Sequence, residues 1–253
     1  MFVTVVEGAV EAAQEGDLTV SDAGLPRSAA TLAAAVSAGF IAGVLIGGVG
    51  GRVAMLLLRV TSSPRVLGME SDDGFTIGRV SSETLFLLGV AVGLGILGGI
   101  FYLIVRNWIP SRGRVPAMVV YFALVGGNGI IHPGGRDFTQ LSPLPLAVAL
   151  FVAIPALYGL ATPMMTERFL REDSLIRRTK HGWIVGLAPL ALAFVFGIIV
   201  LLAAAAVRGI AEAVPRTVDV WRSRPAAWIG RAFLLATAAL SAFGLVSSTI
   251  EIL

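Results

Sequence analysis

Residues 31–51 read TLAAAVSAGFIAGVLIGGVGG, an apolar stretch in which Gly39, Gly43, Gly47 and Gly51 stand four residues apart. On an α-helix this spacing places the glycines in one narrow row. In water each glycine would weaken a helix by about 1 kcal/mol relative to alanine. In lipid the backbone must bond to itself, so the helix still forms. Because a row of small residues lets a second helix approach closely, the stretch predicts a transmembrane helix that packs through glycine.

The composition of the whole chain also indicates a membrane protein. Of its 253 residues, 56% are hydrophobic and only 14% are charged, whereas soluble domains carry about 25% charged residues. The net charge is +3, and the arginines concentrate in connections between apolar runs. That placement reflects membrane topology and contact with anionic lipid rather than binding of nucleic acid. We therefore expect a multi-pass protein of the cell membrane.

Six apolar runs follow an acidic N-terminal segment. Residues 1–27 hold five acidic residues and one arginine and predict a mobile tail, and residues 28–253 form one transmembrane domain. A helix needs about 20 residues to cross the hydrocarbon core of a bilayer. The third run is marginal by this measure and fits a short, tilted or re-entrant segment. The sequence predicts an all-α bundle of six transmembrane helices, with runs at about 29–58, 84–105, 115–131, 144–162, 183–207 and 226–250.

Glycine also recurs in the second run, which holds Gly89, Gly93, Gly95 and Gly99. Pairs of these residues are again four positions apart, so they extend the expectation of close helix contacts to a second helix. We expect the first two helices to form the packed centre of the bundle.

The arginines of the connections predict an orientation. The connections after the second and the fourth run are rich in arginine, which favours the cytoplasm for both. With six crossings the N- and C-termini then also face the cytoplasm. The connections 59–83 and 208–225 hold arginines as well and oppose this arrangement.

Few polar side chains lie inside the apolar runs. None of the runs holds Asp, Glu or Lys near its middle, which argues against a proton relay or a voltage sensor. Asn128 is the clearest intramembrane polar residue. A hydrogen bond to a neighbouring helix is the favoured role for it, and a contact with a transported substrate is the alternative.

Two connections carry the remaining candidate polar residues. One holds Asp72, Asp73 and Arg79, and both connections read most simply as turns. In a six-crossing bundle the first and third connections share one membrane face, so their side chains form a predicted polar cap or entry vestibule. The third connection contributes His132, Arg136 and Asp137.

The sequence indicates neither a metal site nor a cofactor. It contains no cysteine and only two histidines, which the six-helix arrangement places on opposite faces. Walker, nucleophile-elbow and HExxH motifs are missing. We do not expect an enzyme.

The order of motifs resembles that of a bacterial protein group. After the glycine-rich first helix come Asp72-Asp73-Gly74-Phe75 and Ile77-Gly78-Arg79, and later Pro133 and Asp137-Phe138 precede an apolar run. In this order the chain is similar to a group of uncharacterised multi-pass membrane proteins of bacteria, to which no activity is assigned. The resemblance implies location and architecture, and no mechanism.

Two function classes follow from these observations. The first is a small transporter or channel-like protein, in which Asn128 and helices bent at Pro155 and Pro189 line a path. The alternative is a non-catalytic membrane subunit or scaffold that binds through its glycine stripes. Its expected partners are the lipid bilayer together with a second copy of the chain or another membrane protein.

Overall fold

The computed structural model describes residues 27–63, 82–179, 181–192, 202, 205–206, 220–221 and 223–253. Within these ranges every regular element is a helix and there is no strand. This confirms the predicted all-helical class. It also confirms that the chain has helices suited to a membrane, because four of them are long and apolar enough to span one: Arg27–Thr61, Phe86–Val105, Leu144–Phe169 and Arg224–Ile252.

The first helix contains a wide turn at its glycines. It runs from Arg27 to Thr61, with a π-helical segment, η1 (Gly43–Gly50), followed by α2 (Gly51–Thr61). Within this wide turn the amide of Gly51 donates to the carbonyl of Ile46, five residues earlier. π-Helical turns are uncommon and often mark functional positions.

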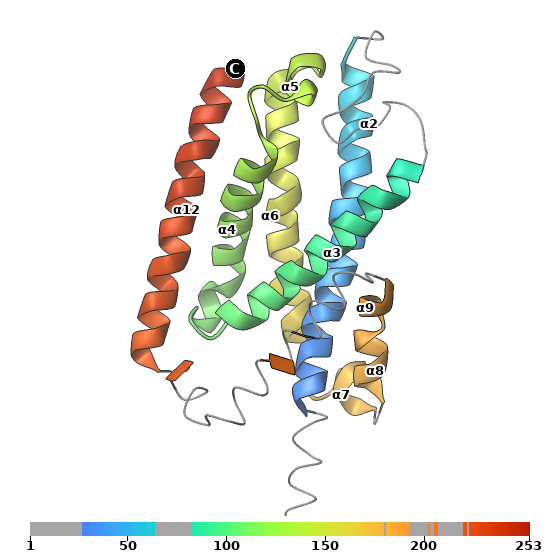
Figure 1. Ribbon diagram of the computed structural model, residues 1–253, viewed down its shortest axis with the longest axis vertical. Helices are drawn as coiled ribbons and strands as arrows, with labels where there is room; N and C mark the ends of the chain where they lie inside the picture. Colours follow the sequence, from blue (N-terminus) through green and yellow to red (C-terminus); the bar gives the residue numbers. More distant parts are fainter. Residues whose placement is uncertain are drawn as a thin grey trace, which may run out of the picture.

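The first helix crosses α3 (Ser82–Val105) at these glycines (Figure 1). A Cβ atom added at Gly43 would lie 2.6 Å from the carbonyl oxygen of Ala91, and one added at Gly95 would lie 2.7 Å from the Cα of Gly43. Gly39 faces Gly95, and Gly99 faces Ala35, at similarly close range. No larger side chain fits at this crossing without moving one of the two backbones.

The close contact is confined to the crossing point. Gly47 still lies near Ala91, and Gly93 is buried. In contrast, a Cβ added at Gly51 or Gly89 would meet no atom within 4 Å beyond its chain neighbours and the backbone of its own helix. Because the two axes diverge away from the crossing, the role predicted for Gly51 and Gly89 in packing stays a prediction.

A third helix, α4 (Arg114–Ile130), follows a short 3₁₀ turn, η3 (Ser111–Gly113). With 17 residues it is about 26 Å long at 1.5 Å per residue, slightly less than the hydrocarbon core of a bilayer. It lies between α6 and α12 (Figure 1), which agrees with the short segment expected for the third run.

Helix α6 (Leu144–Phe169) extends past the predicted end of its run. The run was predicted to end at about residue 162, just before Pro163, but the helix passes through both Pro155 and Pro163 and ends at Phe169. A proline removes one backbone hydrogen bond, and a helix packed among others tolerates that loss. The extension places Glu167 on the helix rather than in a loop. A short helix, α5 (Arg136–Gln140), precedes α6.

The fifth predicted run is only partly described. It begins with α8 (Gly182–Leu187) and α9 (Pro189–Leu192), after the short α7 (Leu175–Arg178). Pro189 starts α9 after a break at Ala188. Most of the run beyond Leu192 lies outside the described residues, so the predicted count of six transmembrane helices is not decided by this fold.

The last helix, α12 (Arg224–Ile252), begins at Ser223, whose hydroxyl accepts a hydrogen bond from the amide of Ala226 at 3.4 Å. It packs mainly against α4. Only 6% of its most apolar 18-residue window is buried. A helix this apolar needs lipid or another protein around it.

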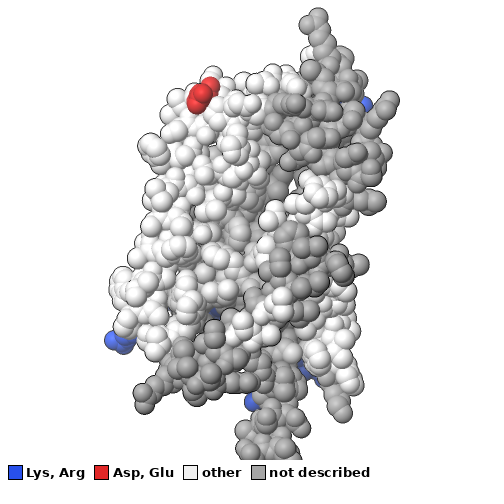
Figure 2. Space-filling view, viewed as in Figure 1, with Lys and Arg blue, Asp and Glu red and all other residues white. Residues whose placement is uncertain are grey.

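The helices define two ends of the bundle. The start of the first helix, the α3–α4 connection, the end of α6, α7 and the start of α12 share one end, which we call the basic end (Figure 1). Arginines are frequent there, and most of the blue surface in Figure 2 lies low, while the red surface lies at the top. Arg27 lies at the basic end and the C-terminal Leu253 at the opposite end. Residues 1–26 lie outside the described residues, so the predicted position of both termini on the cytoplasmic face stays a prediction.

Candidate functional site

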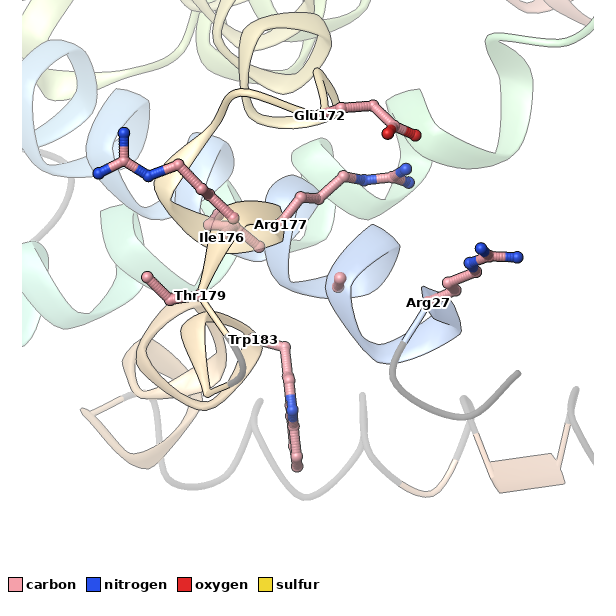
Figure 3. A pocket seen from close by; sticks show the side chains of 8 residues that line it. Arg27, Glu172, Ile176, Arg177, Thr179 and Trp183 are labelled. Carbon is pink, nitrogen blue, oxygen red and sulfur yellow. The ribbon is translucent and has the colours of Figure 1, made fainter. Parts of the chain in front are cut away.

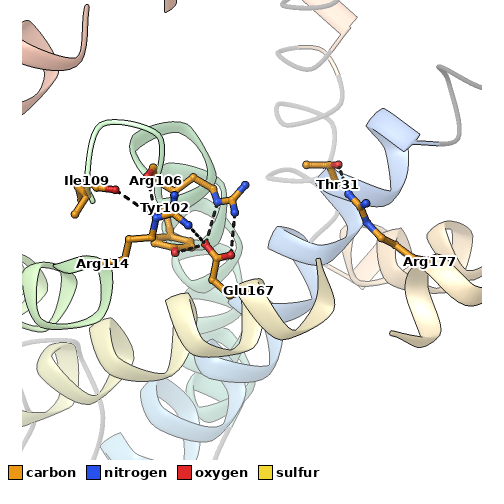
Figure 4. Close-up of polar contacts among 7 residues, drawn as sticks. All are labelled: Thr31, Tyr102, Arg106, Ile109, Arg114, Glu167 and Arg177. Carbon is orange, nitrogen blue, oxygen red and sulfur yellow. Dashed lines mark hydrogen bonds and ion pairs between the residues drawn. The ribbon is translucent and has the colours of Figure 1, made fainter. Parts of the chain in front are cut away.

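The carboxylate of Glu167 joins three helical segments at the basic end (Figure 4). Arg106 reaches it from the end of α3 with two hydrogen bonds, Nε to Oε1 at 3.0 Å and Nη2 to Oε2 at 2.8 Å. Arg114, at the start of α4, donates from Nη1 to Oε1 at 2.9 Å. The hydroxyl of Tyr102 donates to the same oxygen at 2.7 Å. We call these four residues the Glu167 cluster.

Arg114 also closes the α3–α4 connection. Its Nε donates to the carbonyl oxygen of Arg106 at 3.1 Å and lies 3.4 Å from that of Ile109. These carbonyls belong to the end of α3 and the loop after it, where the helix leaves acceptors unpaired. The cluster therefore fixes the turn between two membrane helices and attaches it to the end of α6.

The Glu167 cluster is half-buried and carries a net positive charge. The side chains of Arg106 and Arg114 are 21% and 20% exposed, and that of Glu167 is 36% exposed. Hydrogen bonds to charged groups contribute about 1.5–3 kcal/mol each. Two guanidinium groups against one carboxylate leave a formal charge of +1.

A row of hydroxyls on α6 leads from the Glu167 cluster into the bundle. Tyr158, Thr162 and Thr166 are spaced four residues apart and so share one face of the helix; we call them the polar ladder. The hydroxyl of Tyr158 donates to the carbonyl oxygen of Gly95 at 2.5 Å. Thr162 and Thr166 are wholly buried. Within the described ranges the hydroxyl of Thr166 has no hydrogen-bond partner, whereas that of Thr162 lies beside the hydroxyl of Tyr158.

Unpaired buried hydroxyls are costly. Leaving one without a partner costs about 1–3 kcal/mol, and buried polar groups in native proteins are nearly always satisfied by protein or water. The hydroxyl of Thr166 is such a group, and it lies on a helix that also loses a backbone hydrogen bond at Pro163.

The residues that the sequence predicted as a polar site lie apart from the Glu167 cluster. The side chain of Asn128 lies against Gly244 of α12, so it packs between two helices. His132 lies at the end opposite the basic end, with Nδ1 3.2 Å from the carbonyl oxygen of Ile130. Asp72, Asp73 and Arg79 lie outside the described residues, as do the side chains of Arg136 and Asp137.

The first and third connections do meet, as the predicted polar cap requires. The hydroxyl of Ser62 donates to the carbonyl oxygen of Ser142 at 3.0 Å and accepts from the amide of the same residue at 2.8 Å. Leu58, Ile131 and Phe138 pack together beside this contact. The cap itself stays a prediction, since its charged side chains are not described.

The Glu167 cluster was missed from the sequence because its carboxylate was assigned to a loop. One signal was available: the arginine-rich connections after the second and the fourth run were predicted to share a membrane face, and these connections supply Arg106, Arg114 and Glu167. Nothing in the spacing indicated which arginine would meet the carboxylate. Across the described ranges no three His, Asp or Glu side chains gather closely enough to hold a metal ion.

Comparisons with known proteins add no family to this picture. No family model, no curated protein and no solved structure matches the chain. The class defined by the fold is a helical membrane-protein chain with a charged cluster at one end.

Proposed function

We propose that the protein is a small transporter or channel-like protein of the cell membrane, built from six apolar runs and packed at its centre through glycine. Its path for a polar solute follows the polar ladder on α6, with the Glu167 cluster at the mouth. The observation that carries the proposal is the pair of wholly buried hydroxyls of Thr162 and Thr166, of which that of Thr166 has no hydrogen-bond partner among the described residues.

The position of the ladder supports this proposal. Tyr158 already bonds a backbone carbonyl of α3, at the glycine crossing, and Glu167 lies one residue after Thr166 at the basic end. Pro163 lies between Tyr158 and Glu167 and weakens α6 at that point. Irregular helices of this kind are found where they line a cavity in a membrane protein. The net positive charge of the cluster favours an anionic or neutral polar solute over a cation.

We also propose that the basic end faces the cytoplasm. Arginines of short connections favour the cytoplasmic side of membrane proteins. The start of the first helix would then lie inside and the end of α12 outside, with residues 182–223 beginning and ending on the cytoplasmic side.

Cysteine accessibility tests the proposed path, and the chain suits it because it contains no cysteine. Single variants Thr162→Cys and Thr166→Cys, reconstituted in lipid, are treated with a membrane-impermeant thiosulfonate reagent. We expect both to be modified, because a hydrated path supplies water and reagent to the thiols. The matched control is Leu160→Cys on the same helix, whose side chain is exposed on the outer surface and faces lipid in this proposal. No modification of Thr162→Cys and Thr166→Cys would contradict the path.

A specific observation favours the second candidate, a membrane subunit or scaffold. Helix α12 presents large exposed side chains, including Trp228, Phe233 and Phe243, and contacts mainly α4. A partner helix that packs on this surface would bury it. Unreactive thiols at both threonines would favour this candidate over transport.

A further inference from the structure

A cavity of about 440 Å³ opens at the basic end, apart from the Glu167 cluster and the polar ladder. It lies between the start of the first helix and the segment around α7 and α8 (Figure 3). Three arginines and one carboxylate line it, together with an indole and a threonine. Its principal side chains are Arg27, Glu172, Arg177, Arg178, Thr179 and Trp183.

Small residues hold the two walls together. Ala30, Ala33 and Ile176 form one buried cluster that joins the first helix to α7. A Cβ added at Gly186 of α8 would lie 2.8 Å from the Cβ of Ala33, and the hydroxyl of Ser37 donates to the carbonyl of Gly186 at 3.0 Å. The cavity is thus framed by packed elements rather than by a single surface side chain.

The lining is cationic and includes a buried hydrogen-bond donor that has no partner among the described residues. Three guanidinium groups against the carboxylate of Glu172 give a formal charge of +2. Arg177 is held in place by a hydrogen bond from Nη2 to the hydroxyl of Thr31 at 3.1 Å. Its Nε is buried and has no hydrogen-bond partner within the described ranges. A buried donor on a charged group requires an acceptor, and an anion supplies one.

The position of the cavity indicates which class of anion it binds. It lies where the apolar first helix begins, and the indole of Trp183 lines it, as expected at the headgroup level of a bilayer. Basic pockets beside membrane helices bind lipid headgroups. We propose that this cavity binds the phosphate group of an anionic phospholipid, with Arg27, Arg177 and Arg178 as its cationic partners. The proposal is independent of any transport activity.

The test measures lipid binding to the purified full chain in neutral detergent by native mass spectrometry. The probes are phosphatidylglycerol, phosphatidylcholine and inorganic phosphate. We expect phosphatidylglycerol to bind more tightly than phosphatidylcholine. Arg27→Gln and Arg178→Gln should each weaken it about fivefold, the effect of one arginine near an anionic surface. Glu172→Gln should strengthen binding, because it removes a negative charge from the lining.

Arg112→Gln is the matched control, because Arg112 is exposed at the same end of the bundle but does not line the cavity. Its affinity for phosphatidylglycerol should equal that of the unmodified chain. Millimolar inorganic phosphate should compete only weakly with phosphatidylglycerol, and full displacement of the lipid by phosphate would overturn the assignment to a phospholipid in favour of a free phosphate. Equal affinities for the two lipids, equal losses in the Arg27 and Arg112 variants, or weaker binding after Glu172→Gln would overturn the proposal.

Discussion

Glu167 accepts hydrogen bonds from Tyr102, Arg106 and Arg114, and this explains a carboxylate at the end of an otherwise apolar helix. A carboxylate at a membrane boundary that had no hydrogen-bond partners would contribute little to the stability of the fold. Here both of its oxygens are occupied, and one arginine binds it through two nitrogens, the stronger geometry for such a pair. The residue therefore links α3, α4 and α6 at the basic end.

The substitution Glu167→Gln tests this role. The amide removes the negative charge and turns one acceptor into a donor that faces arginine donors, so we expect the free energy of unfolding to fall by about 1–3 kcal/mol. Unfolding by SDS in mixed micelles, followed by tryptophan fluorescence, measures it. Glu251→Gln, at an exposed position of α12, is the control and should leave the transition in place. Equal transitions for both variants would show that the cluster does not stabilise the fold.

At the scale of elements, the crossing of the first helix with α3 depends on the absence of side chains. Gly43 lies against Ala91 and Gly95 of the opposing backbone, so each contact forces the two helices to a fixed separation. The wide turn of η1 begins at the same residue. The same row of glycines thus serves both the close approach and the change of helical geometry.

A pair of glycine variants tests the crossing. Gly43→Leu should destabilise the chain by about 1–3 kcal/mol or prevent its expression, because overpacking forces the backbones apart. Gly51 lies in the same row, but a Cβ added there meets no atom within 4 Å beyond its own helix backbone and chain neighbours, so the effect of Gly51→Leu should stay within about 0.5 kcal/mol. Expression level and the midpoint of thermal unfolding in detergent measure the effect of each variant. If the two variants were equally stable, or if Gly51→Leu were the more destabilising, the first helix and α3 would not make their closest contact at Gly43.

The elements also show what the sequence could and could not predict. Length and hydropathy located the long helices, because each must cross the same thickness of lipid. Proline was a poor guide to the end of α6, since Pro163 costs one hydrogen bond that a packed membrane helix tolerates. The polar ladder was invisible because threonine within an apolar run shows no pairing until its neighbours are placed. The partner of Asn128 likewise depended on which helix lay beside α4.

At the scale of the whole molecule, the arginines among the described residues concentrate at one end of the bundle. The basic end gathers the Glu167 cluster and the cationic cavity, and the opposite end holds the contact of Ser62 with Ser142. A membrane protein with such an asymmetry inserts in one orientation. The arrangement of α12 parallel to the first helix (Figure 1) then places the C-terminus on the side opposite to the basic end.

Labelling of single cysteines in intact cells tests this central claim most directly. Arg112→Cys marks the basic end and Leu253→Cys marks the opposite end, in a chain without other cysteines. With a membrane-impermeant maleimide we predict that Leu253→Cys reacts in intact cells and that Arg112→Cys reacts only after the membrane is opened. Reaction of both variants in intact cells, or of neither, would show that the two ends of this bundle do not lie on opposite faces of a membrane.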